Sequence, residues 1–178
     1  MSRLPALSRE ALDPEGQAVW DRIASVRSGV RGPFGVLIHV PALADRIRAL
    51  EDYFRFDSTL SAADRELITL AVAREAGARF AWAVHEVRAR EAGIPAETIE
   101  LLRANGELAG LAPREQLFVE VARALLRTRA LPDDLYARAL DQLGQRTLVE
   151  VVTLAGHYTM IGYIINGFDV TPDRDPGF

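Results

Sequence analysis

The sequence contains no cysteine and no lysine, so all 21 of its basic residues are arginine. The lack of cysteine excludes thiol nucleophiles, disulfides, thiolate metal sites and redox relays through sulfur. The lack of lysine excludes Schiff-base chemistry. Catalysis by this chain must therefore depend on carboxylates, tyrosines, the three histidines (His39, His85 and His157) or a bound cofactor.

An excess of positive charge is also missing. The 21 basic residues face 25 acidic ones, which gives a net charge of −4 and an isoelectric point near 5.4. Arginines alternate with acidic residues, and no basic block stands alone. The sequence thus lacks the electrostatic footprint of a nucleic-acid-binding protein, and nucleic acid is not an expected partner.

Long uncharged apolar runs are absent as well. The first residues, Met-Ser-Arg-Leu-Pro, lack the apolar core of a signal peptide, which together with the absence of cysteine favours a cytoplasmic location. Residues 148–168 are the most apolar stretch, but Glu150, His157 and Asn166 lie within it. Such residues are costly at the centre of a bilayer, so we expect a buried helix and no membrane partner.

Helix signals occupy most of the chain. Caps, first-turn prolines and terminal glycines predict eight helices, which begin near residues 14, 41, 61, 80, 95, 113, 132 and 146. Residues 31–35 are expected to be a loop, and 36–40 is a weak strand candidate. With 178 residues, 49% of them apolar, the chain suits a single all-α domain over 1–178. Its core spans about 14–170, and the residues after Phe168 form an extended tail.

The centre of the chain predicts a helical hairpin that carries candidate catalytic residues. Residues 65–73 are apolar almost all round, which is typical of a helix covered on most sides. Glu66 has two interpretations: a partner of the helix dipole or of an arginine, or a partly buried carboxylate with a raised pKa that exchanges a proton. His85 is either a structural histidine or the partner of Glu66 across the hairpin, with Trp82 on the same face.

These residues carry a family resemblance. Arg65-Glu66-Leu67, followed by Phe80-x-Trp82-x-x-His85 and Gly93, resembles the core signature of the carboxymuconolactone decarboxylase family. The flanking segments, including Gly32-Pro-Phe34, Pro41, Gly156-His-Tyr and Asn166, agree with it. The resemblance covers about residues 14–170 and implies the all-α, alkylhydroperoxidase D-like fold.

The resemblance also implies a function. In the peroxidase branch of the family a glutamate and a histidine flank a Cys-x-x-Cys pair, and here Ala78 and Ala81 stand at the cysteine positions. A thiol peroxidase is therefore not expected, and the chain is closer to the decarboxylase branch. This implies a cofactor-free carboxy-lyase that acts on a small carboxylated lactone or related acid, with His85 and Glu66 as catalytic residues and a homo-oligomer, trimer or hexamer, as the assembly. The alternative is a non-catalytic small-molecule-binding or scaffold homo-oligomer with the same fold.

Further residues are candidates for substrate binding. Trp82 would exclude water from the site. Arg79 is either a solvated arginine or holds a substrate carboxylate, and His39 either anchors its loop or approaches His85 if that loop covers the site. His157 and Tyr158 are expected to line a pocket or a subunit interface, or to be hydrogen-bonded in the core. Glu150 and His157 lie seven positions apart, which is unusual for helical metal ligands, so no metal site is expected.

Overall fold

The computed structural model describes residues 2–27 and 29–178, which form helices and connecting segments without any strand. The all-α prediction is confirmed. Eight α-helices follow one another: α1 (Pro14–Val26), α2 (Pro33–Leu37), α3 (Pro41–Phe56), α4 (Ala62–Glu75), α5 (Arg79–Glu91), α6 (Ala96–Arg103), α7 (Pro113–Thr128) and α8 (Asp133–Gly167). Single 3₁₀ turns precede α1 (Arg9–Ala11) and α7 (Leu108–Gly110).

Two elements differ from the sequence prediction. The expected loop at 31–35 and the weak strand at 36–40 are largely replaced by the short helix α2. It forms because Pro33 occupies its first turn and because its apolar side chains Phe34 and Leu37 are buried in the core. Its N-cap, Gly32, has a φ of 61°, and a Cβ there would overlap the ring of Phe80, so only glycine fits this contact.

The second difference concerns the last two predicted helices, which run together as α8. Gly144 interrupts it with a φ of 76° and a ψ of 162°, so the expected break is present as a sharp kink within α8. Helix α8 contains an apolar stretch that is long enough to cross a membrane, yet half of that stretch is buried inside the protein, as in a core helix.

The hairpin of α4 and α5 forms as the sequence predicts. Ser61 and Asp64 make a capping box at the start of α4, which fixes the register of Glu66 within its first two turns. Gly77, with a φ of 61°, supports the tight connection to α5. Residues Leu67–Ala73 are all buried, because α5, α6, α7 and α8 all pack against α4.

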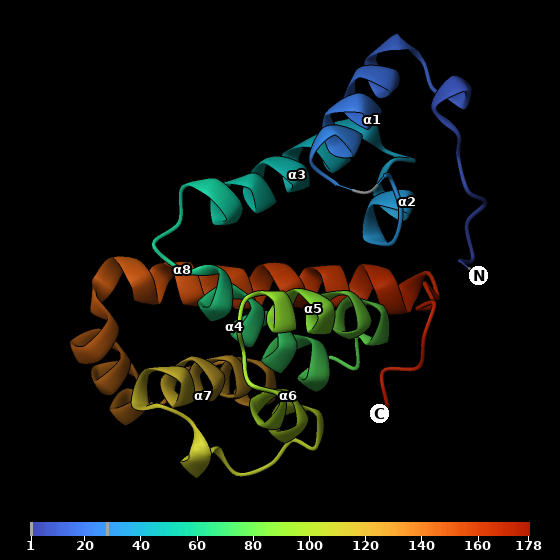
Figure 1. Cartoon of the computed structure of the whole chain (residues 1–178). Coiled ribbons are helices and arrows are strands. Elements are labelled where there is room, and N and C mark those ends of the chain that lie inside the picture. The colour runs from blue at the N-terminus through green and yellow to red at the C-terminus, as the bar shows by residue number, and fades with distance from the viewer. Residues whose placement is uncertain (1, 28) are drawn as a thin grey trace.

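The helices are arranged in tiers around α8 (Figure 1). α1, α2 and α3 form one layer above α8, α4 and α5 lie against α8, and α6 and α7 complete the opposite side. The segment after α8 turns back beside α5, where Phe178 packs edge-on against Trp82. This arrangement brings α3, α4, α5 and α8 to one place, which contains the candidate site.

Candidate functional site

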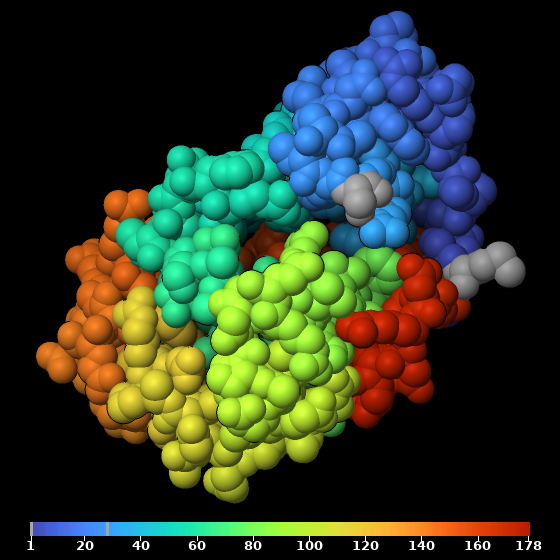
Figure 2. Space-filling model, in the orientation of Figure 1, coloured from blue at the N-terminus to red at the C-terminus, as the bar shows by residue number. Residues whose placement is uncertain are grey.

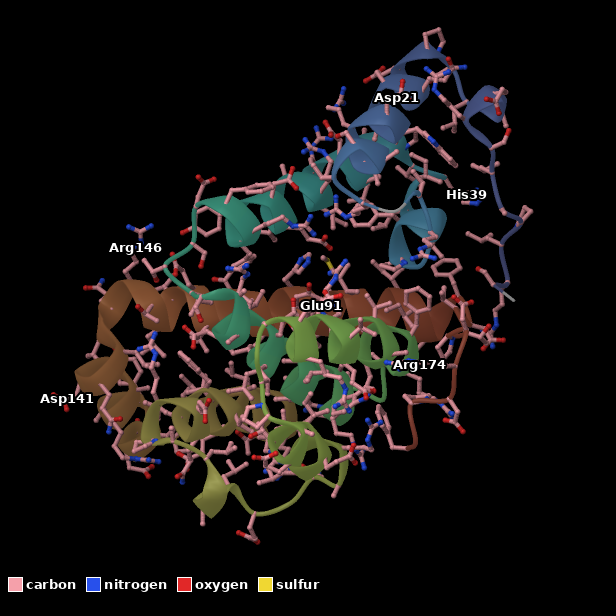
Figure 3. The ribbon with its side chains drawn as sticks, viewed as in Figure 1. Asp21, His39, Glu91, Asp141, Arg146 and Arg174 are labelled. Carbon is pink, nitrogen blue, oxygen red and sulfur yellow. The ribbon has the colours of Figure 1, made fainter. Side chains whose placement is uncertain are left out.

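A cavity of about 440 Å³ lies where α3, α4, α5 and α8 meet. Figure 2 shows the hollow between the teal surface of α3 and the green surface of α5, with α8 visible at its floor. The wall is mostly polar: α3 supplies Glu51 and Arg55, α4 supplies Arg65, Glu66 and Thr69, α5 supplies Arg88 and Glu91, and α8 supplies His157 and Tyr158. In Figure 3, Glu91 marks the α5 side of this space.

A smaller cavity of about 100 Å³ adjoins the larger one. Its wall comes from α2, α3, α5, α8 and the connection between α1 and α2. The wall is mainly apolar, with the side chains Phe34, Phe80, Val84, Ile161 and Ile165. Glu51, Arg88 and Tyr158 line both cavities and form the wall between them. A ligand with one apolar and one polar end therefore matches the two cavities together.

His85 and Glu66 form a direct pair at this wall. His85 Nδ1 lies 2.6 Å from Glu66 Oε2, as a charge-assisted hydrogen bond between α5 and α4. Glu66 lines the larger cavity and His85 the smaller one. Only 8% of the His85 side chain and 14% of the Glu66 side chain is exposed, so the pair is largely shielded from water. The sequence hypothesis that places these residues opposite each other in the hairpin matches this geometry.

The ionisation of Glu66 corrects one sequence hypothesis. One of its two interpretations is a carboxylate whose pKa is raised by burial, and burial alone does act in that direction. The charge and the hydrogen bond of His85 together outweigh burial, with help from Arg88 and Arg65, and lower the pKa of Glu66 below its ordinary value. Glu66 is therefore an ionised acceptor that orients the His85 ring through Nδ1. His85 is the residue of the pair whose side chain can both donate and accept a proton.

A second glutamate–histidine pair lies on the other side of the wall. His157 Nε2 is 3.3 Å from Glu51 Oε1, and Arg27 forms a close ion pair with the other carboxylate oxygen of Glu51. Burial raises the pKa of Glu51, but the hydrogen bond from His157 and the charge of Arg27 hold it at about 2. His157 Nδ1 is buried and has no partner among the described residues.

Tyr158 stands between the two pairs. Its ring lies edge-on to both imidazoles, with centroid distances of 4.9 Å to His85 and 5.2 Å to His157. The two histidines are thus at most about 10 Å apart across one phenol ring. Burial, together with the negative charges of Glu51 and Glu66, raises the pKa of Tyr158, so its hydroxyl keeps its proton.

Arg88 and Glu51 are site residues that sequence reasoning missed, and Arg88 is the one without an ion pair in residues 2–27 and 29–178. Arg88 is partly buried and lines both cavities, and its guanidinium makes no hydrogen bond or ion pair with any described residue. Other arginines of these walls are engaged: Arg27 with Glu51, Arg55 with a backbone carbonyl of α1, and Arg65 with the carbonyl of Leu60. The sequence spacing could have identified Arg88, since it follows His85 by three positions on one helix and so shares its face.

Residues 41–124 match the family model of the carboxymuconolactone decarboxylase family. This segment belongs to the carboxymuconolactone decarboxylase family. It contains Glu51, Glu66, His85 and Arg88, and it ends before α8, which supplies His157 and Tyr158. No curated protein sequence matches the chain.

Solved structures confirm the alkylhydroperoxidase D-like fold. An uncharacterized peroxidase-related protein from Ralstonia eutropha JMP134, described as an alkylhydroperoxidase AhpD core, superposes with a TM-score of 0.81 at 17% identity, over 99% of this chain and 94% of that chain. An uncharacterized peroxidase-related protein from Silicibacter sp. TM1040 has a TM-score of 0.77 at 17% identity, over 97% and 93%. In this chain the positions proposed for the redox cysteines are Ala78 and Ala81, and Ala81 lines the smaller cavity.

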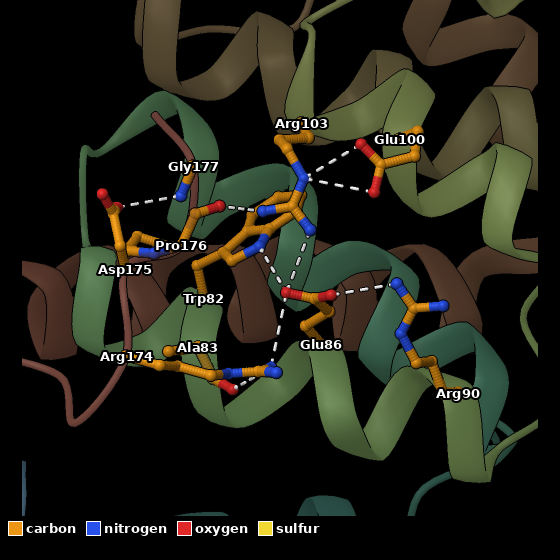
Figure 4. A network of polar contacts seen from close by, with 10 residues as sticks. All are labelled: Trp82, Ala83, Glu86, Arg90, Glu100, Arg103, Arg174, Asp175, Pro176 and Gly177. Atoms are coloured by element: carbon orange, nitrogen blue, oxygen red, sulfur yellow. Dashed lines mark hydrogen bonds and ion pairs between the residues drawn. The ribbon is translucent and has the colours of Figure 1, made fainter.

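Trp82 does not form a wall of either cavity, contrary to the sequence prediction. Its side chain is fully buried on another side of α5, where its indole N–H donates to Glu86 at 3.2 Å. Figure 4 shows that Arg90, Arg103 and Arg174 also converge on Glu86. Trp82 contacts this network, whereas His85, three positions further along α5, lines the smaller cavity.

Arg79 and His39 also lie outside both cavities. Arg79 is half exposed and pairs with Asp175 of the tail, with 2.6 Å between nitrogen and oxygen. His39 Nε2 lies 3.1 Å from the carbonyl oxygen of Pro5, and Figure 3 places it beside α2, away from Glu91. Neither residue therefore contributes to the walls of the candidate site. No group of three or more histidine, aspartate and glutamate side chains in residues 2–27 and 29–178 could hold a metal ion.

Proposed function

We propose that the protein is a cofactor-free carboxy-lyase that acts on a small carboxylated lactone or a related acid. The observation that supports this most is the shielded pair of His85 and Glu66, 2.6 Å apart, at the junction of a polar and an apolar cavity. The family of residues 41–124 agrees with it. The absence of cysteine excludes the thiol peroxidase chemistry that the fold also accommodates.

The reaction needs two events that this site can serve. The bond between the ring carbon and its carboxylate breaks, CO₂ leaves, and the electron pair moves into a conjugated carbonyl to give an enolate. A proton is then added to carbon, and the carbonyl reforms. His85 supplies this proton from Nε2, which makes no hydrogen bond with any described residue, while ionised Glu66 accepts from Nδ1 and stabilises the imidazolium.

Arg88 binds the acid group that the substrate retains. Its guanidinium has no partner of its own among the described residues, and its place in both walls lets it hold a carboxylate while the rest of the molecule enters the smaller cavity. The apolar side chains there exclude water from the enolate, which strengthens each hydrogen bond to it.

The test is direct. Purified protein is mixed with γ-carboxymuconolactone, and released CO₂ and the change in ring absorbance are followed. We expect turnover by the intact chain and a loss of about 10²-fold or more in His85→Ala, since general acid catalysis contributes about this much. His39→Ala is the matched control, because this histidine lies outside both cavities. No CO₂ from the intact protein, or equal rates in both histidine variants, would reject the proposal.

We also propose that the protein assembles as a homo-oligomer, a trimer or a hexamer. The support is the apolar character of α8, which leaves Val149 59% exposed and Tyr163 72% exposed. A groove of about 680 Å³ runs beside the same helix, with Val152, Gly156 and Met160 in its wall. A second copy of the chain would cover these groups.

A further inference from the structure

The proposed reaction creates a negative charge on oxygen, which needs a hydrogen-bond donor. Glu51, Arg88 and Tyr158 are the three residues that line both cavities. Glu51 is an acceptor that is already bonded to Arg27 and His157, and Arg88 is the anchor for the retained acid group. We propose that Tyr158 is a further catalytic residue, whose hydroxyl donates a hydrogen bond to the enolate oxygen formed as CO₂ leaves.

The position of the Tyr158 ring is fixed from both sides. His85 lies edge-on at 4.9 Å and His157 edge-on at 5.2 Å, and each imidazole is itself tied to a glutamate of another helix. Edge-to-face aromatic contacts of this kind hold ring orientation. A donor that is already in place needs no rearrangement when charge develops, and this is the property that makes such donors effective.

In this arrangement the second glutamate–histidine pair, Glu51 and His157, positions Tyr158. Glu51 and His157 contact no group of the hairpin pair directly, but through Tyr158 they lie opposite His85. They are positioning residues: the Glu51 bond holds the His157 ring, and that ring holds the phenol. Two side chains thus act on different atoms of the substrate: His85 delivers the proton to carbon, and Tyr158 binds the enolate oxygen.

The phenol is held in its neutral form, as a donor must be. Burial and the charges of Glu51 and Glu66 raise the pKa of Tyr158. The charge of Arg88 and a side-chain hydrogen bond with Thr69 act in the opposite direction and are outweighed. Tyr158 therefore keeps its proton at neutral pH and shares it with the enolate in a hydrogen bond. The proton stays on the tyrosine oxygen throughout, so no covalent bond of Tyr158 forms or breaks in this step.

This inference rests on the proposed lyase function, but it can be tested without turnover. Tetronate is a stable enolate of a five-membered lactone ring, and γ-butyrolactone is the corresponding neutral lactone. Binding of both to the full chain and to Tyr158→Phe is measured by titration calorimetry. The phenylalanine ring preserves both edge-on contacts and removes only the hydroxyl.

We expect Tyr158→Phe to bind tetronate ten-fold or more weakly than the intact chain, since a hydrogen bond to a charged group is lost. Binding of γ-butyrolactone should be unchanged. Tyr136→Phe is the matched control, because this tyrosine of the same helix is 50% exposed and lies outside both cavities. Equal tetronate affinity in the intact chain and Tyr158→Phe, or no tetronate binding by the intact chain, would overturn the inference.

Steady-state turnover provides a second, independent test of the role of Tyr158. If the lyase is active, Tyr158→Phe should lower kcat by about 10²-fold or more with little change in KM, as for other donors to an oxyanion. A merely structural tyrosine would instead affect the unfolding midpoint and leave kcat of the folded fraction intact. Hydroxyl-dependent tetronate binding without CO₂ release would support the donor and reject the lyase, so the two failures are distinguishable.

Discussion

Replacing Glu150 with glutamine should remove a pH-dependent part of the stability of this protein. Glu150 lies on α8 and is only 4% exposed. Its carboxylate joins the connection between α3 and α4 to α8. It accepts hydrogen bonds from the Tyr53 hydroxyl at 2.7 Å, the Thr59 amide at 3.0 Å, the Ser58 hydroxyl at 3.1 Å and Arg146 Nε at 3.3 Å.

The magnitude follows from the pKa of this carboxyl. Burial raises the pKa of Glu150, but the bonds from Thr59 and Tyr53 outweigh burial and hold it at about 2, against an ordinary value of 4.5. A difference of this size corresponds to about 3 kcal/mol of stability. Because the pKa is lower in the folded state, the contribution is complete above the unfolded value and is lost as the pH falls towards 2.

Urea unfolding of the intact chain and of Glu150→Gln at pH 6 and pH 3 measures this effect. The other acidic groups are common to both proteins and cancel in the difference between their free energies of unfolding. We expect that difference to shrink by about 2 kcal/mol between pH 6 and pH 3. The control is Glu97→Gln, an exposed glutamate on α6, whose difference should stay within about 0.5 kcal/mol. An equal Glu150 difference at both pH values would refute the reasoning.

Three further predictions concern the site and the assembly. Arg88→Met should raise KM for a carboxylated substrate by about 10²-fold with a smaller effect on kcat, whereas Arg79→Met, outside both cavities, should change neither in steady-state kinetics. Trp82→Phe should lower the free energy of unfolding by about 1–2 kcal/mol, because the indole bond to Glu86 is lost, and it should leave KM unchanged. Size-exclusion chromatography should show a trimer or hexamer at micromolar concentration, and a clean monomer would contradict the proposed assembly.

Much of the fold could be predicted because its signals are local. Asp13 caps α1 through the Gly16 amide, and Ser61 with Asp64 caps α4, as their sequence spacing indicates. α2 could not be predicted in the same way. Its few residues are too short for helical periodicity, and its stability comes from burial of Phe34 and Leu37 against the rest of the protein.

The candidate site, too, could be predicted only where it depends on local sequence signals. The pairing of Glu66 with His85 followed from the hairpin, because both lie on adjacent helices with a short connection. The choice among arginines did not follow. Arg79 and Arg88 are both on α5. Only the packing of the tail and of α3 shows that Arg79 is paired with Asp175, whereas the guanidinium of Arg88 lines the cavities without a hydrogen bond or ion pair to a described residue.

The sequence by itself determined the helical class, the hairpin and the chemistry that is excluded, since caps, apolar periodicity and residue types are properties of short segments. Only the tertiary structure decided what meets at the cavity. Glu51 and His157 are separated by 106 positions, and Tyr158 reaches His85 from another helix. Helix packing sets these contacts through the rotation of each helix about its axis, which the complementary surfaces of all its neighbours fix together.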